Sequence, residues 1–175
     1  MEGNDLGLLH VYTGDGKGKT TAALGLALRA WGHGMRVCII QFMKRGEDYG
    51  EVMAMRRLNV EVFQFGSGKL IMKGKHCQED LDCASRALEL ASSIMASGEF
   101  DVVILDEINV AISFDLLRCC DVLDALRTRA SDVEVICTGR NAPEELRREA
   151  DLVTVMTVEK HPYDGGLNAR KGIEY

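Results

Sequence analysis

The sequence has no long apolar run. None of its hydrophobic stretches approaches the ~18 residues that a membrane-spanning helix requires. The N-terminus, Met1 to Asp5, is polar and acidic, unlike the basic and then apolar start of a secretory signal. We therefore expect a cytoplasmic protein with no membrane partner.

Cysteine pairs with metal-binding spacing are also absent. The chain has 6 cysteines and 4 histidines, but no two cysteines form a C-x-x-C pair and the histidines are scattered, which disfavours a structural zinc site. Cys38 and Cys137 lie inside apolar runs, where a buried free thiol is typical. The cysteines are therefore expected to be reduced thiols, as is usual in cytosolic proteins.

An excess of positive charge is missing as well. Lysine and arginine number 21 against 27 aspartates and glutamates, which gives a formal net charge of -6 at pH 7. Because nucleic-acid binding calls for a basic face, no nucleic-acid partner is expected. With 175 residues, 46% of them hydrophobic and 27% charged, the chain has the size and composition of one soluble domain spanning residues 1–175.

Strand-like and helix-like segments alternate along the whole chain. This alternation predicts an α/β fold of the P-loop (RecA-like) type, a mostly parallel sheet with helices on both faces. Ligands of such sheets bind beyond the carboxyl ends of the strands. The expected strands are residues 8–13, 36–42, 60–65, 101–105, 133–138 and 152–158, and the expected helices are residues 20–31, 47–58, 78–97, 115–130 and 144–149.

A glycine-rich loop follows the first strand. Residues 13–21 read T-G-D-G-K-G-K-T-T, and they stand between an apolar strand and an Ala/Leu-rich helix, the context of a phosphate-binding P-loop. Alternating glycines leave backbone N–H groups free for an anion, Lys19 adds a charge, and the Thr20 hydroxyl reaches a phosphate-bound Mg²⁺. The usual first glycine is replaced by Thr13, so the loop is expected to hold a nucleotide triphosphate in an unusual way.

A second acidic element completes this pattern. The apolar run 102–105 ends in Asp106 and Glu107, the Walker B arrangement that places carboxylates near the Mg²⁺ of a bound nucleotide. Two solvated carboxylates at a strand end are the alternative interpretation. The sequence leaves open which of the two contacts the metal directly.

Other candidates have two interpretations each. Lys17 either screens the phosphates or is a solvated loop lysine. Arg29 lies on the helix after the loop, where a surface position is the default. The segment 41–45 either faces the cleft or is a solvated loop, and Arg140 either reaches the triphosphate or merely belongs to a β–α turn. The polar end of the chain, residues 160–175, is either functional or an extended segment packed over a sheet edge.

Taken together, these segments resemble the P-loop ATP:corrinoid adenosyltransferases. The resemblance covers residues from about 7 to 175 and rests on residues 13–23, 41–44, 103–107, 138–140 and the ending 160–175. It implies transfer of the 5′-deoxyadenosyl group of ATP to the cobalt of a Co(I) corrinoid, with release of intact triphosphate. ATP is then the co-substrate, the corrinoid (cobalamin) is the acceptor, and the phosphates are the leaving group.

The resemblance also implies roles for individual residues. Lys19, Thr20 and Glu107 would be catalytic, and Thr20, Asp106 and Glu107 would hold Mg²⁺. Asp15 would lie near the ribose and Arg29 near the nucleotide. The expected nucleotide-binding residues are Gly14, Asp15, Gly16, Lys17, Gly18, Lys19, Thr20, Thr21, Arg29 and Arg140.

Partners follow from the same resemblance: a homodimer, and a flavin-dependent reductase that supplies electrons. Many relatives carry aromatic residues after the third strand that crowd the lower face of the corrinoid. Here Phe65 has no second aromatic after it, and Leu70, Ile71 or Met72 would supply apolar bulk instead. A P-loop nucleoside or small-molecule kinase is the alternative function, disfavoured by the altered loop start and the missing basic lid.

Overall fold

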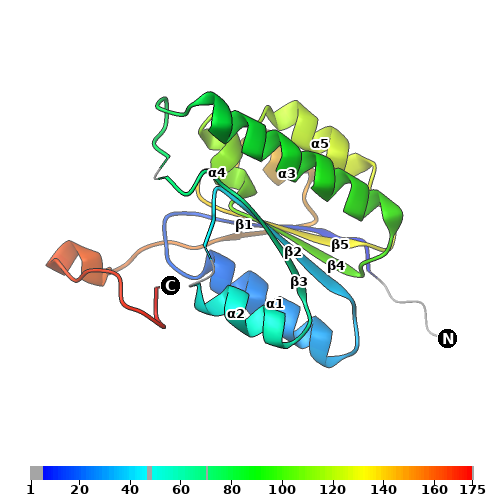
Figure 1. Ribbon diagram of the computed structural model, residues 1–175, viewed down its shortest axis with the longest axis horizontal. Helices are drawn as coiled ribbons and strands as arrows, with labels where there is room; N and C mark the ends of the chain where they lie inside the picture. Colours follow the sequence, from blue (N-terminus) through cyan, green and yellow to red (C-terminus); the bar gives the residue numbers. More distant parts are fainter. Residues whose placement is uncertain (1–5, 47–48, 70, 175) are drawn as a thin grey trace.

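A parallel β-sheet forms the centre of the computed structural model, which describes residues 6–46, 49–69 and 71–174 (Figure 1). Within these residues the sheet has six strands in the order β3-β2-β4-β5-β1-β6, and all neighbouring strands run parallel. The strands are β1 (Leu9–Thr13), β2 (Val37–Phe42), β3 (Glu61–Phe65), β4 (Val102–Asp106), β5 (Glu134–Thr138) and β6 (Leu152–Val155).

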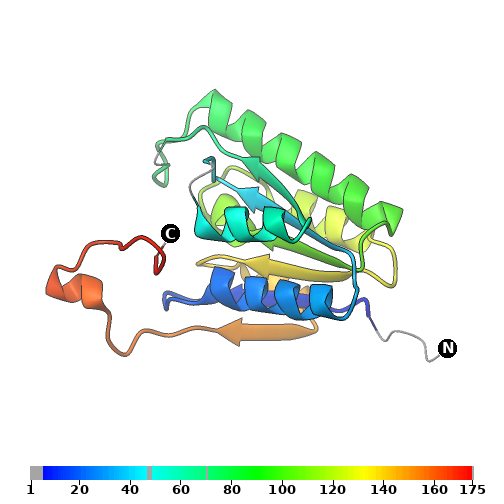
Figure 2. The same ribbon diagram turned by 60° about the horizontal axis from the view of Figure 1, so that its bottom comes forward.

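Helices cover both faces of the sheet, which confirms the predicted P-loop α/β fold class. α1 (Lys19–Gly32) and α2 (Gly50–Arg57) lie on one face, and α3 (Gln78–Ser97), α4 (Ile108–Ser113), α5 (Cys119–Arg127) and α6 (Glu144–Glu149) lie on the other (Figures 1 and 2). None of the helices in the described part of the chain is long and apolar enough to cross a membrane.

Alternate residues of the central strands pack into two separate hydrophobic cores, one on each face of the sheet. In β2, Val37 and Ile39 pack with the buried alanines of α1, whereas Cys38, Ile40 and Phe42 pack with those of α3. A strand covered on both faces is apolar at every position, which is why the sequence shows continuous apolar runs here. All six cysteines are unpaired thiols, and burial raises the pKa of Cys38 and Cys137 to about 12.

The chain departs from the predicted elements in two places. The expected helix 115–130 is wrong in its limits, because α4 follows β4 almost directly and Asp115, with φ 61°, ends that region before α5 begins. The last strand ends at Val155 instead of residue 158, because Met156 turns toward the glycine loop and accepts a hydrogen bond from Gly16 N at 2.8 Å. The expected helix 47–58 begins at Gly50 within the described residues, and residues 47–48 lie outside them.

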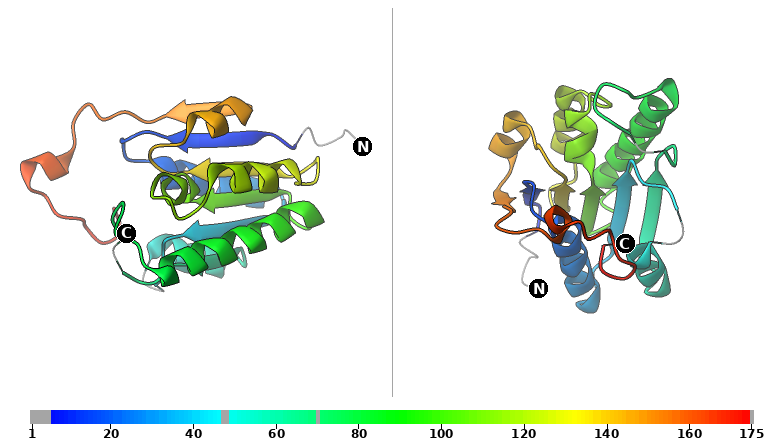
Figure 3. Two further views of the ribbon diagram at one scale, coloured as in Figure 1. Left: turned by 90° about the horizontal axis from the view of Figure 1, so that it is seen from above. Right: turned by 90° about the vertical axis from the view of Figure 1, so that its left-hand side faces the viewer.

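The C-terminal segment, residues 156–174, leaves the sheet and returns to it. It passes through a short 3₁₀ helix, Pro162–Gly165, and then doubles back. Figure 3 (right) looks onto the carboxyl ends of the strands, with this segment crossing in front of them. This ending therefore contacts the glycine loop, through Ile173 and Glu174 at Lys17, instead of packing along a sheet edge, and its functional role stays a prediction.

Candidate active site

The glycine loop lies against the backbone that follows β6. Gly14 has φ +98°, and a Cβ there would lie 2.3 Å from the Met156 carbonyl oxygen; at Gly16 it would lie 2.6 Å from the Thr157 carbonyl oxygen. Backbone contacts this close leave no room for a side chain. Close packing against residues 156 and 157 therefore requires glycine at both positions, and the Gly16 N–H itself donates to the Met156 carbonyl at 2.8 Å.

Thr13 shows why the loop begins without a glycine. Its side chain is buried, with 5% of the residue exposed. The Thr13 hydroxyl accepts a hydrogen bond from Ala142 N at 3.1 Å, and its carbonyl accepts one from Met156 N at 2.8 Å. The threonine thus ties β1 to the turn that carries Arg140, a contact that glycine cannot make.

Lys19 lies beneath the loop. Its ammonium donates to the Gly14 carbonyl at 2.7 Å and to the Gly16 carbonyl at 2.6 Å. Burial and the nearby positive charge of Arg140 lower the pKa of Lys19, against smaller opposing effects of Glu107 and Asp15. The carbonyls of the loop hold the Lys19 ammonium at the edge of the first cavity, and a P-loop lysine contacts phosphates from within its loop.

Asp106 is a buried carboxylate, 1% exposed, that accepts four hydrogen bonds. One oxygen accepts from the hydroxyls of Thr20 (2.8 Å) and Thr138 (2.7 Å). The other accepts from the Gln41 amide (3.1 Å) and the Lys44 ammonium (2.8 Å). Burial opposes ionisation, but the charge of Lys44 and these hydrogen bonds hold the pKa of Asp106 below its usual range.

Glu107 has the opposite environment. Its backbone is left-handed, with φ 66°, and its N–H donates to the Thr138 hydroxyl at 3.0 Å. No residue in the described part of the chain donates a hydrogen bond to its carboxylate. Burial first, and the charge of Asp106 second, raise the pKa of Glu107. Such a carboxylate gains from an added cation.

Two adjoining cavities open at this edge of the sheet. The first has a volume of ≈ 560 Å³ and the second ≈ 470 Å³. Both are bordered by Thr20, Thr21, Glu107, Ile173 and Glu174. The first is also lined by Asp15, Gly16, Lys17, Gly18, Lys19, Val110, Phe114, Arg140, Asn141 and His161, and the second by Leu24, Lys44, Tyr49, Gly50, Glu51 and Gly172.

The structure gathers most of the predicted nucleotide-binding residues around the first cavity. Gly14, although part of the loop, does not border the cavity and packs against Met156 instead. Arg29 is exposed in the last turn of α1 and borders neither cavity, so its role stays a prediction. A larger groove of ≈ 680 Å³ between α3 and α5 is lined by acidic, hydroxyl and apolar residues. It lies away from the glycine loop.

Thr138 is the site residue that sequence reasoning assigned no contact of its own. Its hydroxyl donates to Asp106 and accepts from the Glu107 N–H, so it sets the position of both acidic residues. The signal was its place at the end of β5, which runs next to β4 in the sheet. Gln41, which sequence reasoning weighed as a cleft residue, pairs in register with Asp106.

Comparison with known proteins shows the family of the chain. The family model described as ATP:corrinoid adenosyltransferase BtuR/CobO/CobP matches residues 5–175. The chain belongs to this family. It is 35% identical over 173 residues to a corrinoid adenosyltransferase of Pseudomonas aeruginosa, covering 98% of this chain and 85% of that protein. The corresponding enzyme of Escherichia coli K12 is 34% identical, with 98% and 87% covered.

A corrinoid adenosyltransferase of Salmonella typhimurium, CobA, is also 34% identical, over 97% of this chain and 86% of that protein. Among solved structures, the flagellar accessory protein FlaH from Methanocaldococcus jannaschii is similar, with a TM-score of 0.59, 17% identity, and coverage of 87% of this chain and 72% of that one. At this identity the likeness to FlaH concerns the fold alone.

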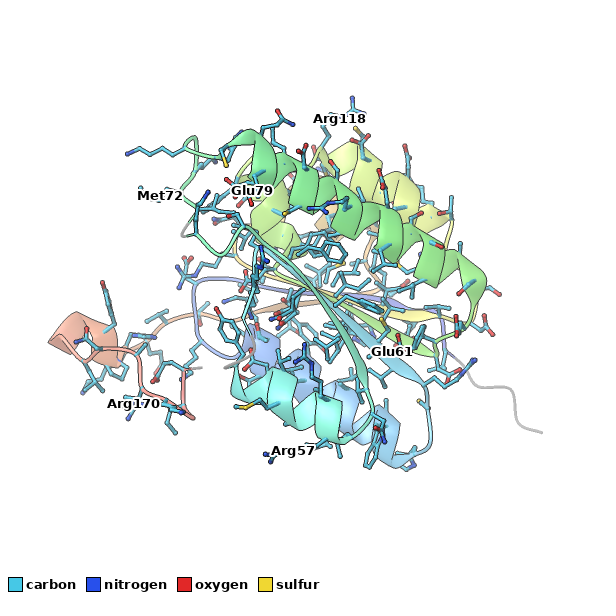
Figure 4. All side chains as sticks on the ribbon, in the orientation of Figure 1. Arg57, Glu61, Met72, Glu79, Arg118 and Arg170 are labelled. Carbon is cyan, nitrogen blue, oxygen red and sulfur yellow. The ribbon has the colours of Figure 1, made fainter. Side chains whose placement is uncertain are left out.

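The adenosyltransferase's segment after β3 carries part of the apolar bulk expected there. Ile71, like Phe65, packs against the core, whereas Met72 is 50% exposed and projects from the loop before α3 (Figure 4). Leu70 lies outside the described residues. A role of these side chains toward the corrinoid stays a prediction.

Proposed function

We propose that this adenosyltransferase moves the 5′-deoxyadenosyl group of ATP to the cobalt of a Co(I) corrinoid and releases inorganic triphosphate. One observation carries the proposal: Lys19, Thr20 and Glu107 meet at a single cavity at the carboxyl end of the sheet, in a chain of this family. Residues 1–175 would act as a single domain in this reaction.

The reaction requires little proton transfer by side chains of the protein. The cobalt supplies the electron pair that forms the Co–C5′ bond, and the C5′–O bond breaks with its pair on the departing triphosphate. What the protein must supply is in-line positioning and stabilisation of the negative charge that the leaving group gains. Lys17, Lys19 and Arg140 are the cations that border the first cavity, and they suit that task.

A Mg²⁺ ion fits the donors of this site. The Thr20 hydroxyl donates its hydrogen bond to Asp106, so the lone pairs of its oxygen remain available to a cation. Glu107 offers a carboxylate to which no described residue donates a hydrogen bond. The described residues contain no group of three or more His, Cys, Asp or Glu side chains suited to a metal. This is compatible with Mg²⁺, which typically takes one or two protein ligands and completes its shell with phosphates and water.

Thr20 and Glu107 would therefore contact the metal, which would neutralise charge on the triphosphate. Asp106, with both oxygens engaged, would act through Thr20. On this assignment Glu107→Gln raises the Mg²⁺ concentration needed for half-maximal turnover by roughly tenfold, the effect of losing one charged ligand. Glu89→Gln on α3 serves as the matched control, since Glu89 borders the groove between α3 and α5.

A Mg²⁺ titration of turnover, together with Mn²⁺ binding followed by electron paramagnetic resonance, measures this effect. If Glu107→Gln and Glu89→Gln give the same metal dependence, the metal assignment is wrong.

Further proposals concern partners and location. We propose a cytoplasmic homodimer that receives its corrinoid reduced by a flavin-dependent reductase. The edge strand β6 supports the dimer, because Leu152, Val153 and Val155 are 37–49% exposed on a strand that pairs only with β1 among the described residues. Mass measurement by light scattering tests it, and a monomeric mass would contradict it.

The activity is tested with purified protein, ATP, Mg²⁺ and chemically reduced cob(I)alamin under anaerobic conditions. The expected result is loss of the Co(I) absorption and appearance of light-sensitive adenosylcobalamin, dependent on both protein and ATP. Persistence of the Co(I) spectrum at stoichiometric protein would contradict the proposal.

A further inference from the structure

The C-terminal segment brings a carboxylate into the cavity proposed for triphosphate. The Lys17 ammonium donates to Glu174 Oε1 at 2.8 Å and to the Ile173 carbonyl at 2.9 Å. Glu174 and Ile173 border the same cavity as the glycine loop and Arg140. The Glu174 carboxylate thus pairs with Lys17, one of the cations proposed to stabilise the leaving triphosphate.

Glu174 is held in place by its own segment. Arg170 donates from its backbone N–H to Glu174 Oε2 at 2.7 Å, and from its guanidinium to both carboxylate oxygens at 3.1 and 3.2 Å. Figure 4 shows Arg170 on the part of the C-terminal segment that returns toward the body of the protein. Hydrogen bonds from Arg170 first, and from Lys17 second, lower the pKa of Glu174 to about 2. The carboxylate is therefore ionised at neutral pH.

The contact with the loop is easily exchanged. The side chains of Lys17 and Glu174 are 45% and 25% exposed, and a solvent-exposed pair of this kind contributes little stability. Residues 162–174 are otherwise almost all exposed, so displacing this end of the chain uncovers little apolar surface. A triphosphate carries several negative charges and forms charge-assisted hydrogen bonds to lysine.

We propose that Glu174 is an internal competitor of triphosphate for Lys17, so that it weakens the binding of inorganic triphosphate and favours its release after adenosyl transfer. This inference rests on the proposed function. Its chemistry is an exchange of partners: the Lys17 ammonium passes from the Glu174 carboxylate to a phosphate oxygen when triphosphate binds, and returns when it leaves. No covalent bond changes.

The test is calorimetric titration of the full-length protein with inorganic triphosphate, without corrinoid. Glu174→Gln keeps the shape of the side chain and removes its charge, so it should tighten triphosphate binding about twofold to fivefold, the range of an exposed ion pair. In a Lys17→Met background the same change should have no effect. Glu149→Gln removes the carboxylate of a comparable exposed pair, which joins α6 to Arg127 on α5, and should leave binding unchanged.

Unchanged or weaker binding in Glu174→Gln overturns the inference, as does an equal gain in the Lys17→Met background. Failure of the proposed function has a different signature, since no adenosylcobalamin would then form from ATP and cob(I)alamin, whatever the effect of Glu174→Gln on triphosphate binding.

Discussion

Lys19→Ala is expected to lower the rate of adenosyl transfer by roughly 10²–10³-fold, the usual cost of losing one preorganised group that stabilises developing charge. Lys19 is held at the centre of the loop by the carbonyls of Gly14 and Gly16. Without its ammonium, the departing triphosphate loses one of the three cations that border the first cavity in the described part of the chain.

The measurement is the initial rate of adenosylcobalamin formation at saturating Mg²⁺, with circular dichroism to verify the fold. Arg127→Ala is the matched control, because Arg127 is an exposed cation on α5 that pairs with Glu149 and borders neither cavity. Turnover equal to wild type in Lys19→Ala would show that the loop does not grip the leaving group.

Asp106→Asn is expected to abolish turnover and to lower the free energy of unfolding by about 3–5 kcal/mol, the cost of leaving a buried charge without its partner. The four groups that surround Asp106 all donate to it, so an amide nitrogen at this position faces donors on every side. The Lys44 ammonium, which is itself largely buried, loses its nearest counter-charge.

Urea denaturation of four proteins tests this account: wild type, Asp106→Asn, Lys44→Met and the double variant. The double variant should be more stable than the sum of the single effects predicts, since it removes the ammonium that lost its nearest counter-charge and kept the more distant Glu51, at 3.8 Å. Additive losses would mean that Lys44 and Asp106 do not depend on each other. A wild-type midpoint for Asp106→Asn would contradict the network itself.

The sequence predicted the fold and the neighbourhood of the site because both depend on local patterns. Continuous apolar runs identify strands covered on both faces, and the glycine loop and Asp106-Glu107 identify themselves by residue type and by their place at strand ends. The parallel sheet then brings these ends together at one edge, without any need to know individual contacts.

The contacts inside the site escaped prediction because they join residues that are distant in sequence. The hydrogen bonds of Asp106 reach Thr20, 86 positions away, and Gln41, 65 positions away. Which carboxylate is saturated and which faces the cavity follows from the register of β2, β4 and β5. The contact of residues 173 and 174 with Lys17 likewise depends on the course of the C-terminal segment, which the pattern of apolar residues in the sequence does not predict.

The fate of the phosphates tests the central claim most directly. ³¹P nuclear magnetic resonance of a reaction containing ATP, Mg²⁺ and cob(I)alamin should show one inorganic triphosphate for each adenosylcobalamin formed, because the glycine loop holds the leaving group of a reaction at C5′. Stoichiometric ADP, as from a kinase, or pyrophosphate as the primary product would contradict it.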